Sequence, residues 1–277
     1  MHNKGMGCNV RLYTVKYIAL VYTATVVGVC SCLLPMRAVA MNVSATEFSV
    51  SLDATRLIYD PASAGATLTV TNPQDYPMLV QSKVLDEAMV QKAPFIVTPP
   101  LFRLDGLQQN KLRIVCTGGT FAPDRETLHW LCVKAIPPQS DDAWAQAGPQ
   151  AKTVQMNLQM SVNACLKLLV RPGSIKGRPV DVAHQLAWQQ KGQQLTVRNP
   201  TPFYMNFSSV RLGGVAVGEL DYVAPLSHKT VTVAHKGSAK AVVQWKVIND
   251  FGDVSQEYRA DVKMGDSMPV ADRNEGA

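Results

Sequence analysis

From about residue 46 onward, the hydrophobic positions of the chain come in short runs rich in β-branched residues, and turn-forming residues separate these runs. No apolar stripe repeats with the 3.6-residue period of an amphipathic helix. Proline has no amide donor for a β-ladder, so Asn72-Pro73, Thr98-Pro99-Pro100 and Pro137-Pro138 mark the ends of runs. The pattern predicts an all-β protein whose first strands lie at residues 47–52, 66–71, 77–85, 111–115 and 128–136.

The longest alternating segment of the chain runs from Val154 to Val170. One set of alternate positions is apolar and the set between them is mostly polar, and a β-strand places two such sets on opposite faces. We therefore expect one long strand, with an apolar face made of Val154, Met156, Leu158, Met160, Val162, Ala164, Leu166, Leu168 and Val170. Residues 139–152, just before it, combine polar residues, Gly and Pro without a period, which indicates a long exposed loop.

A domain boundary is expected at Arg171-Pro172-Gly173, directly after this segment. The pattern predicts an N-terminal domain of residues 41–171, a C-terminal domain of residues 172–264 and a polar, disordered tail of residues 265–277. The 237 residues from 41 to 277 are too many for one sandwich of about 100 residues and suit two. Strands of the second domain are expected at residues 196–198, 206–211, 230–233 and 241–248.

Residues 1–40 differ in character from the rest of the chain. They hold four basic residues and no acidic one, residues 17–34 carry no charge, and small residues follow at Ala38-Val39-Ala40. This order is typical of a secretory signal, so we expect cleavage after Ala40 and no stable membrane insertion afterwards. Two alternatives are a retained membrane anchor and a lipoprotein acylated at Cys30 or Cys32, although neither cysteine follows the small-residue pair.

Charge and motifs exclude several classes of function. Without residues 1–40, the net charge falls from +6 to +2, with 23 basic and 21 acidic residues, so no nucleic-acid partner is expected. The chain has no GxSxG, HExxH, phosphate-binding glycine loop or CxxC motif. We expect no enzyme, no cofactor and no metal. A copper carrier could use Met156, Met160 and His129, but methionines in an alternating strand are explained more simply by packing.

Three cysteines remain after residue 40, namely Cys116, Cys132 and Cys165. Disulfides persist in secreted proteins, and an odd count leaves one thiol single.

The most specific motif is FAPDRETLHWLCVKAIPP at residues 121–138. It resembles the periplasmic chaperones of the chaperone/usher pathway, which carry a Pro/Asp/basic/Glu/hydroxyl run before an aromatic strand that ends in Ile-Pro-Pro. Further similar segments cover most of residues 46–262: TRLIYD, NPQDYPMLVQSKV, FIVTPPLFRLD, CLKLLVRP, NPTPFYMNF and VINDFGD. The long loop makes the chain similar to the branch that serves capsule-like or thin fimbrial adhesins. The resemblance implies two immunoglobulin-like β-sandwich domains in an L arrangement, located in the periplasm.

The resemblance also implies a function. Chaperones of this family fold pilin- or adhesin-like subunits by lending them a β-strand, and deliver them to an outer-membrane usher. The lent strand would fill the groove of the subunit with Val154, Met156, Leu158, Met160 and Val162. Self-association of the free protein would be another way to cover this strand.

Individual residues acquire roles through the same resemblance. Arg56 in TRLIY and Lys167 in CLKLLVRP match the paired cations that hold the terminal carboxylate of the subunit. Arg103, Glu126 and Asp250 match a charged network between the domains. Cys132 and Cys165 match a disulfide between the last two strands of the first domain, at the base of the long loop, which leaves Cys116 as a buried free thiol or a source of mispairing.

A structural surface protein is the alternative to a chaperone. A pilus subunit should carry an alternating donor segment at its own N-terminus and end in a strand near its C-terminus. Here residues 41–44 are too short for the first feature and the tail is polar, so we favour the chaperone.

Overall fold

The computed structural model describes residues 43–138, 156–218, 220–234 and 241–265, with only the backbone for residues 43, 44, 156 and 157. The expected signal, the expected loop at residues 139–152 and the tail beyond residue 265 lie outside the described residues. Both sandwich domains fall in one compact unit, Ala45–Gln150 with Asn157–Ala277, and the strands β1 and β10 begin in a second unit. No helix in the described ranges is long and apolar enough to cross a membrane.

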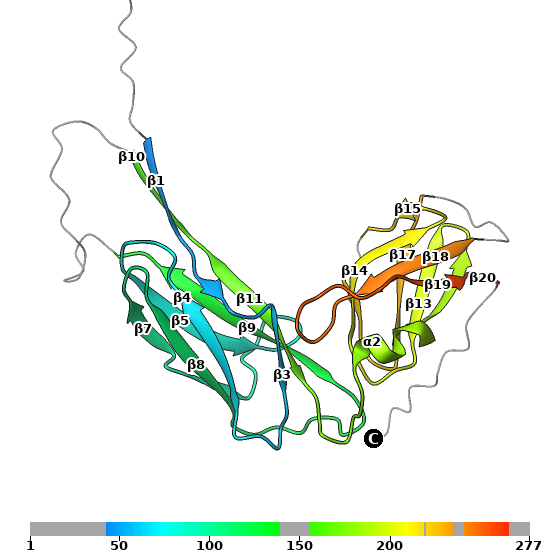
Figure 1. Cartoon of the computed structure of the whole chain (residues 1–277), viewed down its shortest axis with the longest axis horizontal. Coiled ribbons are helices and arrows are strands. Elements are labelled where there is room, and N and C mark those ends of the chain that lie inside the picture. Colours follow the sequence, from blue (N-terminus) through cyan, green and yellow to red (C-terminus); the bar gives the residue numbers. More distant parts are fainter. Residues whose placement is uncertain (1–42, 139–155, 219, 235–240, 266–277) are drawn as a thin grey trace, which may run out of the picture. The chain divides into compact units, whose positions relative to one another are not determined.

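The N-terminal domain is a sandwich of two sheets (Figure 1). The five-stranded sheet has the order β3-β11-β9-β5-β7, with bounds Arg56–Tyr59, Asn163–Val170, Thr127–Ile136, Met78–Leu85 and Leu101–Leu104. The four-stranded sheet has the order β2-β4-β8-β6, with bounds Ser51–Leu52, Ala66–Thr71, Gln109–Cys116 and Phe95–Thr98. The expected strand at residues 47–52 is two strands, because the chain leaves β1 (Val43–Phe48) before it enters β2.

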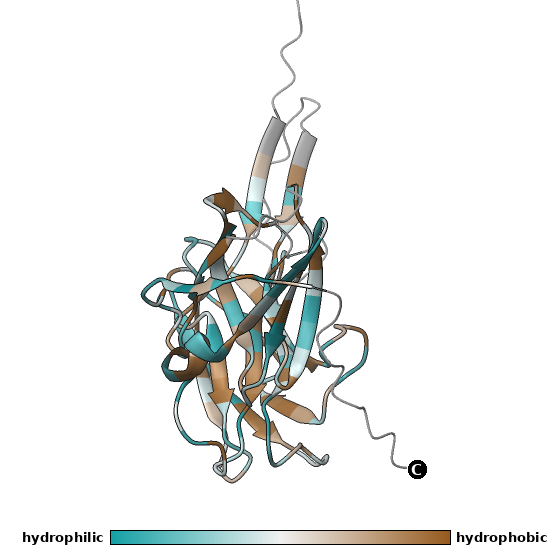
Figure 2. Ribbon diagram, turned by 90° about the vertical axis from the view of Figure 1, so that its right-hand side faces the viewer, coloured by the Kyte–Doolittle hydropathy of each residue, from teal (hydrophilic) through white to brown (hydrophobic). Residues whose placement is uncertain are grey.

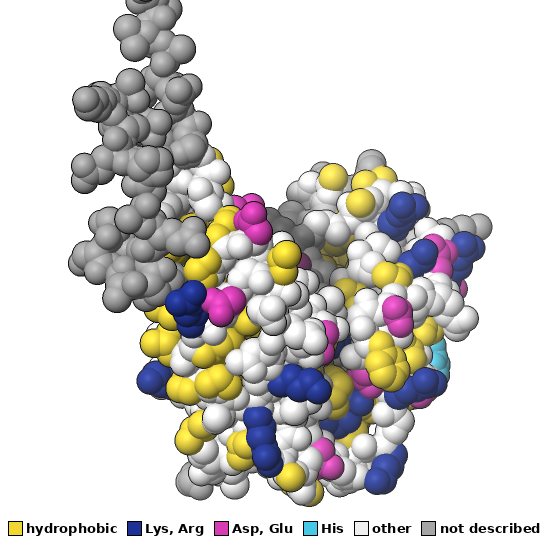
Figure 3. Space-filling model, turned by 60° about the vertical axis from the view of Figure 1, so that its left-hand side comes forward, with side chains coloured by type: hydrophobic (Ala, Val, Ile, Leu, Met, Phe, Trp, Pro, Cys, Tyr) yellow, Lys and Arg dark blue, Asp and Glu magenta, His cyan; other side chains and the backbone are white. Residues whose placement is uncertain are grey.

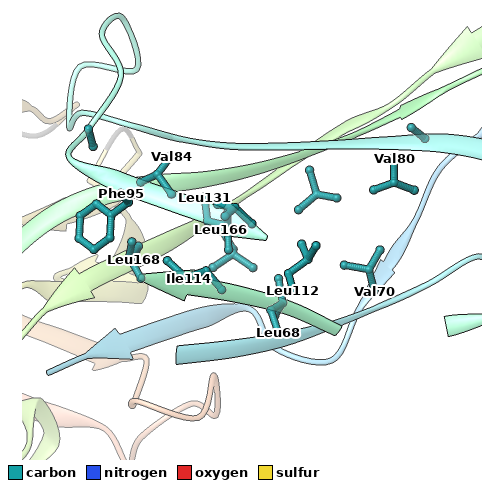
Figure 4. Close-up of a cluster of buried hydrophobic side chains, with 14 of the residues drawn as sticks. Leu68, Val70, Val80, Val84, Phe95, Leu112, Ile114, Leu131, Leu166 and Leu168 are labelled. Atoms are coloured by element: carbon teal, nitrogen blue, oxygen red, sulfur yellow. The ribbon is translucent and has the colours of Figure 1, made fainter. Parts of the chain in front are cut away.

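Strand parity explains the core of this domain. Leu166, Leu168 and Val170 of β11 are almost fully buried, as the alternation predicted. They meet Leu68, Val70, Leu112 and Ile114 of the opposite sheet, and Figure 4 shows most of these side chains pointing toward one another between the two sheets. Burial of such aliphatic side chains is worth about 1.5–3 kcal/mol each, so this layer is a main source of the stability of the domain.

The C-terminal domain is a second sandwich with its own core. One sheet has the order β17-β13-β12-β20, with bounds Ser227–Thr232, Gln194–Asn199, Ala187–Lys191 and Lys263–Met264. The other has the order β15-β14-β18-β19, with bounds Val215–Ala216, Met205–Leu212, Val242–Val247 and Tyr258–Asp261; β16 (Tyr222–Val223) also pairs with β14. Trp188 and Trp245 lie in its centre with ring centroids 5.4 Å apart. The prediction of an all-β protein with two sandwiches is therefore confirmed.

Two helical segments in the described part of the chain belong to the C-terminal domain, α2 (Pro179–Val182) and the 3₁₀ helix η1 (Ala183–Gln185), and Ala183 is part of its core. The sequence pattern did not predict them, because segments this short show no helical period. In Figure 2 many strands carry both brown and teal segments, as expected for strands that place alternate residues in the core and in solvent.

Each sandwich uses a buried asparagine to close an Asn-Pro turn. The Asn72 amide donates to the carbonyls of Tyr76, Leu104 and Asp105, and its oxygen accepts from the amide of Gln74. In the second domain, the Asn199 amide donates to Phe203, Val223 and Ala224 in the same way. Buried backbone carbonyls need such donors, so these Asn-Pro pairs are structural.

Candidate functional site

Arg56 and Lys167 lie side by side on neighbouring strands. β3 and β11 run parallel, and their register places Lys167 directly beside Arg56. On its other side β11 pairs with β9, where Trp130 is the partner of Lys167. Arg56 is only 9% exposed, and Lys167 is half-buried. Two residues that are 111 positions apart in sequence thus form one cation pair, a name used below for Arg56 and Lys167.

The cation pair has no anionic partner among the described residues. Neither side chain has a carboxylate within 4.0 Å, and Nε of Arg56 is buried without a hydrogen bond in that part of the chain. Lys167 donates through Nζ to the side-chain oxygen of Asn206. Buried charges in proteins are normally paired, so two adjacent cations without a carboxylate indicate a place for an anion.

The electrostatics of the cation pair would favour a bound anion. The pKa of Lys167 is lowered to about 8, mainly by burial and also by the charges of Arg56 and Lys229, while Asp221 opposes the shift. Burial likewise lowers the pKa of Arg56, offset in part by Asp250 and Glu126. A bound carboxylate would reverse these shifts because it stabilises both charged forms.

Aromatic rings surround the ammonium group of Lys167. Its Nζ lies 4.5 Å from the ring centre of Tyr222 and 5.8 Å from that of Trp130. Tyr222 and Asn206 are cross-strand partners on β16 and β14, so both contact the same ammonium group from the C-terminal domain. The site therefore combines cations from the first domain with polar and aromatic groups from the second.

The predicted donor strand is divided at Val162. β10 (Met156–Ser161) pairs with β1, whereas β11 pairs with β9 and β3. Between them, the Val162 amide donates to the carbonyl of Phe48 and its carbonyl accepts from the amide of Ala135. The expected single strand from 154 to 170 is therefore two strands in the described part, because the chain changes its pairing partner at Val162. Figure 1 shows β1 and β10 side by side.

Three of the five predicted donor residues can be placed with their side chains. Leu158, Met160 and Val162 are 46%, 45% and 38% exposed. We call these three residues the donor face. Met156 begins β10, but its side chain lies outside the described residues, and so does Val154 altogether. Three large apolar side chains at alternate positions are thus left uncovered by the described chain.

A buried ion-pair network joins the two domains, with Arg171 at its centre. Nε of Arg171 donates to Glu126 at 2.6 Å, and its two terminal nitrogens donate to Asp250 at 2.8 and 2.7 Å. The other oxygen of Glu126 accepts from the amide of Tyr204 at 2.7 Å. Burial raises the pKa of Glu126, and Arg171 opposes this shift. Burial lowers the pKa of Arg171, but its bonds to Asp250 and Glu126 outweigh that effect and raise it.

The prediction that Arg103 belongs to this network is wrong. Arg103 is on the edge strand β7 and forms an exposed ion pair with Asp105 at 2.8 Å. Its register leads through Leu79 to Ile136, the last residue of β9, whereas Glu126 directly precedes the first. Ten residues of strand span about 30 Å, so Arg103 cannot reach Glu126. The motif around Arg103 covers only neighbouring residues, whereas a place in the network depends on which end of the sheet Arg103 occupies.

The disulfide prediction is confirmed. Cys132 of β9 and Cys165 of β11 are cross-strand partners, and their sulfurs are bonded. Cys116 is free and half-buried at the end of β8, with its Sγ 3.1 Å from the carbonyl oxygen of Gly118. Of the two expectations for Cys116, a buried free thiol or a source of mispairing, the structure shows a free thiol that is only half-buried.

The residues of a copper carrier do not come together in the described part of the chain. The ring of His129 packs against those of Phe95 and Phe121, with centroids 5.3 and 6.0 Å away. Met160 is exposed on β10, and no group of three or more His, Cys, Asp or Glu residues with metal-site geometry occurs among the described residues. Burial lowers the pKa of His129, as expected for an imidazole among aromatic rings.

Sequence reasoning missed four residues of the site: Asn206, Tyr222, Arg171 and Tyr204. Three of them occur in segments that carry the family resemblance, NPTPFYMNF and CLKLLVRP, so a local signal existed. Tyr222 lies in no such segment, and only the pairing of β16 with β14 brings it to Lys167.

Comparison with known proteins agrees with this geometry. Residues 49–176 match the family of pili and flagellar-assembly chaperones, PapD N-terminal domain, and residues 181–259 match the pili assembly chaperone PapD, C-terminal domain. The chain is 55% identical over 197 residues to the chaperone protein AfaB of Escherichia coli, covering 70% of this chain and 80% of AfaB. It is 46% identical over 240 residues to the chaperone protein PsaB of Yersinia pestis, covering 81% and 88% of the two chains.

Solved structures show the same relationship. The crystal structure of the E. coli chaperone DraB matches with a TM-score of 0.71 and 51% identity, covering 80% of this chain and all of DraB. The SafB chaperone of Salmonella enterica, solved in complex with the SafA pilin, is a further similar structure at 47% identity, with a TM-score of 0.71, 80% of this chain and the whole matched chain covered. Both domain models match, the relatives are more than 45% identical, and two adjacent cations have no anionic partner among the described residues. The chain therefore belongs to the PapD-like pilus-assembly chaperone family.

Proposed function

We propose that this protein is a periplasmic, non-catalytic chaperone that captures a pilin- or adhesin-like subunit, here called the client. It holds the C-terminal carboxylate of the client between Arg56 and Lys167 and adds its own strand to the open edge of the client. The loaded complex then delivers the client to an outer-membrane usher, the partner that the family implies.

The observation that carries this proposal is that the cation pair has no anionic partner among the described residues. Arg56 and Lys167 are adjacent on parallel strands, desolvated, and without a carboxylate among the described residues. An arginine fork and a lysine ammonium can each bind one oxygen of a terminal carboxylate. The site can therefore bind the C-terminus of a client chain, and the strand residues beside it can pair with a client strand.

Strand addition supplies most of the apolar contact in this proposal. A client strand that pairs with β10 would receive the donor face in its groove. Burial of Leu158, Met160 and Val162 is worth about 5 kcal/mol before the cost of ordering both partners. Lys167 lies on β11, which follows β10 directly along the chain. Anchoring the carboxylate therefore sets the register in which these side chains enter the groove.

Compartment and class follow from the same family. The disulfide of Cys132 and Cys165 suits the oxidising periplasm. The relatives are named as chaperones. On the face shown in Figure 3, basic side chains are scattered among acidic and apolar ones, which supports a protein partner rather than a nucleic acid.

Substitution of either cation tests the proposal. Arg56→Ala and Lys167→Ala should each lower client capture at least a hundredfold, since removal of one partner from a desolvated charge pair costs several kcal/mol. Capture is measured by co-purification with the subunits produced from neighbouring genes, and melting curves check the fold.

Lys111→Ala is the matched control, because Lys111 is an exposed strand lysine on β8 in the other sheet. Its capture should equal that of the wild type. Unchanged capture in both cation variants would overturn the anchoring role.

A further inference from the structure

The ring of Tyr222 is the centre of a cluster that the cation pair alone does not explain. Nζ of Lys167 lies 4.5 Å from the ring centre, and Nζ of Lys229 lies 5.5 Å from it. The Tyr222 hydroxyl donates to Oε1 of Glu87 at 3.3 Å. Tyr222 thus contacts two ammonium groups through its ring and donates a hydrogen bond from its hydroxyl to a carboxylate.

Glu87 is held in place from both domains. Its second oxygen, Oε2, accepts from the Tyr204 hydroxyl at 3.2 Å, and its backbone carbonyl accepts from Nε1 of Trp130 at 3.1 Å. Glu87 follows β5 in the first domain, whereas both tyrosines belong to the second. This residue therefore connects the domains at a point separate from the Arg171 network.

Physical chemistry assigns the ring a role for the lysine. A lysine side chain loses rotamer entropy when it is fixed, so holding it in place before binding favours capture. Its ammonium has three donors. One goes to Asn206 and the Tyr222 ring attracts the charge, which leaves donor capacity for an incoming carboxylate.

A neutral ring suits this task better than an acidic residue. A carboxylate at position 222 would pair with Lys167 and compete with the client. A hydroxyl that donates to a carboxylate makes its ring richer in electrons, and hydrogen-bonded groups polarise one another in this way. Glu87 thus acts on the ammonium through the ring.

We propose that Tyr222 is a further residue of the carboxylate site and that Glu87 is its positioning residue, together holding the Lys167 ammonium ready for the client terminus. This inference rests on the proposed function. It adds a residue from the second domain, and a residue that acts through it, to the two cations of the first.

The test compares a free carboxylate with an amide. The probe is a short synthetic peptide of alternating valine and threonine residues, prepared once as the C-terminal acid and once as the C-terminal amide. For each variant, the affinity for the acid is divided by the affinity for the amide. This ratio measures the contribution of the terminal carboxylate to affinity, because a general loss of fold or of strand pairing lowers both affinities alike.

Graded outcomes are expected from four variants. Tyr222→Leu should lower the ratio about five- to tenfold, since the cation–π contact is lost in a partly desolvated site. Tyr222→Phe and Glu87→Ala should lower it about two- to threefold, because the ring stays but is no longer held. Glu87→Gln should lower the ratio less than Glu87→Ala does, since an amide can still hydrogen-bond both hydroxyls but carries no charge to polarise the ring.

Two controls complete the design. Tyr258→Phe removes a hydroxyl that donates to the carbonyl of Val180 within the second domain, and it should leave the ratio unchanged. In a Lys167→Met background, Tyr222→Leu should have no further effect on the ratio, as expected if the ring acts through the lysine.

Three outcomes would contradict the proposals, and they can be told apart. A wild-type ratio near one, or no binding of either peptide, would count against the proposed carboxylate anchor itself. A high wild-type ratio that Tyr222→Leu retains would overturn the role of Tyr222 and leave the anchor intact. Equal losses for acid and amide would show that Tyr222 supports only the fold or the docked strand.

Discussion

At the scale of single residues, Lys167 lies where its charge is poorly compensated. Burial lowers its pKa to about 8 from the 10.5 of a free lysine, and the positive charges of Arg56 and Lys229 contribute in the same direction. A lysine whose folded pKa is depressed binds fewer protons in the folded than in the unfolded state between those two values. The charged form therefore makes the free chaperone less stable than it would be with a neutral residue, whereas the proposed function requires this charge to bind the client.

The pH dependence of stability checks this account. Between pH 8 and pH 10.5 the unfolded state holds more protons at this residue, so the free energy of unfolding should rise with pH relative to Lys167→Met. After allowance for its partial exposure, we expect a relative gain of about 2 kcal/mol across this window. Urea unfolding of both proteins between pH 7 and pH 10 measures the difference. Parallel curves would contradict the depressed pKa.

Other residue roles are readable from sequence only in part. Arg56 and Lys167 were predicted as a pair from motifs far apart, and the β3–β11 register places them side by side. Arg103 was predicted wrongly, because its motif carries no information on which end of the sheet it occupies. Arg171 performs the role instead, since it directly follows β11 and reaches both Glu126 and Asp250.

At the scale of elements, β10 differs from the other strands of the first domain. Leu158 and Met160 share one face, and Gln159 lies between them on the other, yet all three are exposed. β10 pairs with β1 and with no strand of the two sandwich sheets in the described part of the chain. The fold of the free chaperone thus makes little use of this apolar face.

Charges placed on the two faces of β10 should have different effects on binding. Leu158→Glu and Met160→Glu should each lower client affinity more than a hundredfold, because a carboxylate in the apolar groove costs several kcal/mol. Gln159→Glu should keep nearly full affinity, and all three variants should unfold within about 0.5 kcal/mol of the wild type. Affinities measured beside urea unfolding decide the matter: equal losses at the three positions would refute binding through this face.

At the scale of the whole molecule, the two sandwiches meet through several separate contacts within one compact unit. Besides the Arg171 network and Glu87, the side chains of Leu128, Leu169 and Tyr204 form a small buried cluster between them. The loop after β18 also approaches the first domain, since a Cβ on Gly252 would lie 2.5 Å from Oγ1 of Thr55, next to Arg56. The geometry of the proposed carboxylate site therefore depends on how closely the domains approach.

A methyl group at Gly252 should disturb this contact. Gly252 has φ +98°, so alanine costs about 1–2 kcal/mol in backbone strain alone. Gly214→Ala is the matched control, with φ +85° and nothing within 4 Å of its added Cβ. Gly252→Ala should lower the free energy of unfolding by about 1–2 kcal/mol more than the control, and Thr55→Ala should restore that excess in the double variant. Equal costs at the two glycines would show that the domains do not meet here.

The sequence by itself determined the features that depend on neighbouring residues. Strand parity, Asn-Pro turns and the burial of Leu166, Leu168 and Val170 follow from backbone geometry, which repeats every two residues and can be read along the chain. The cation pair and the disulfide were also within reach, because each matches a motif that resembles a known family. Only the tertiary structure decided which distant residues meet. The change of partner at Val162, the central place of Arg171 and the contact of Tyr222 with Lys167 depend on sheet order and on how the domains pack. These are long-range choices, and no local pattern of hydrophobic and polar residues encodes them.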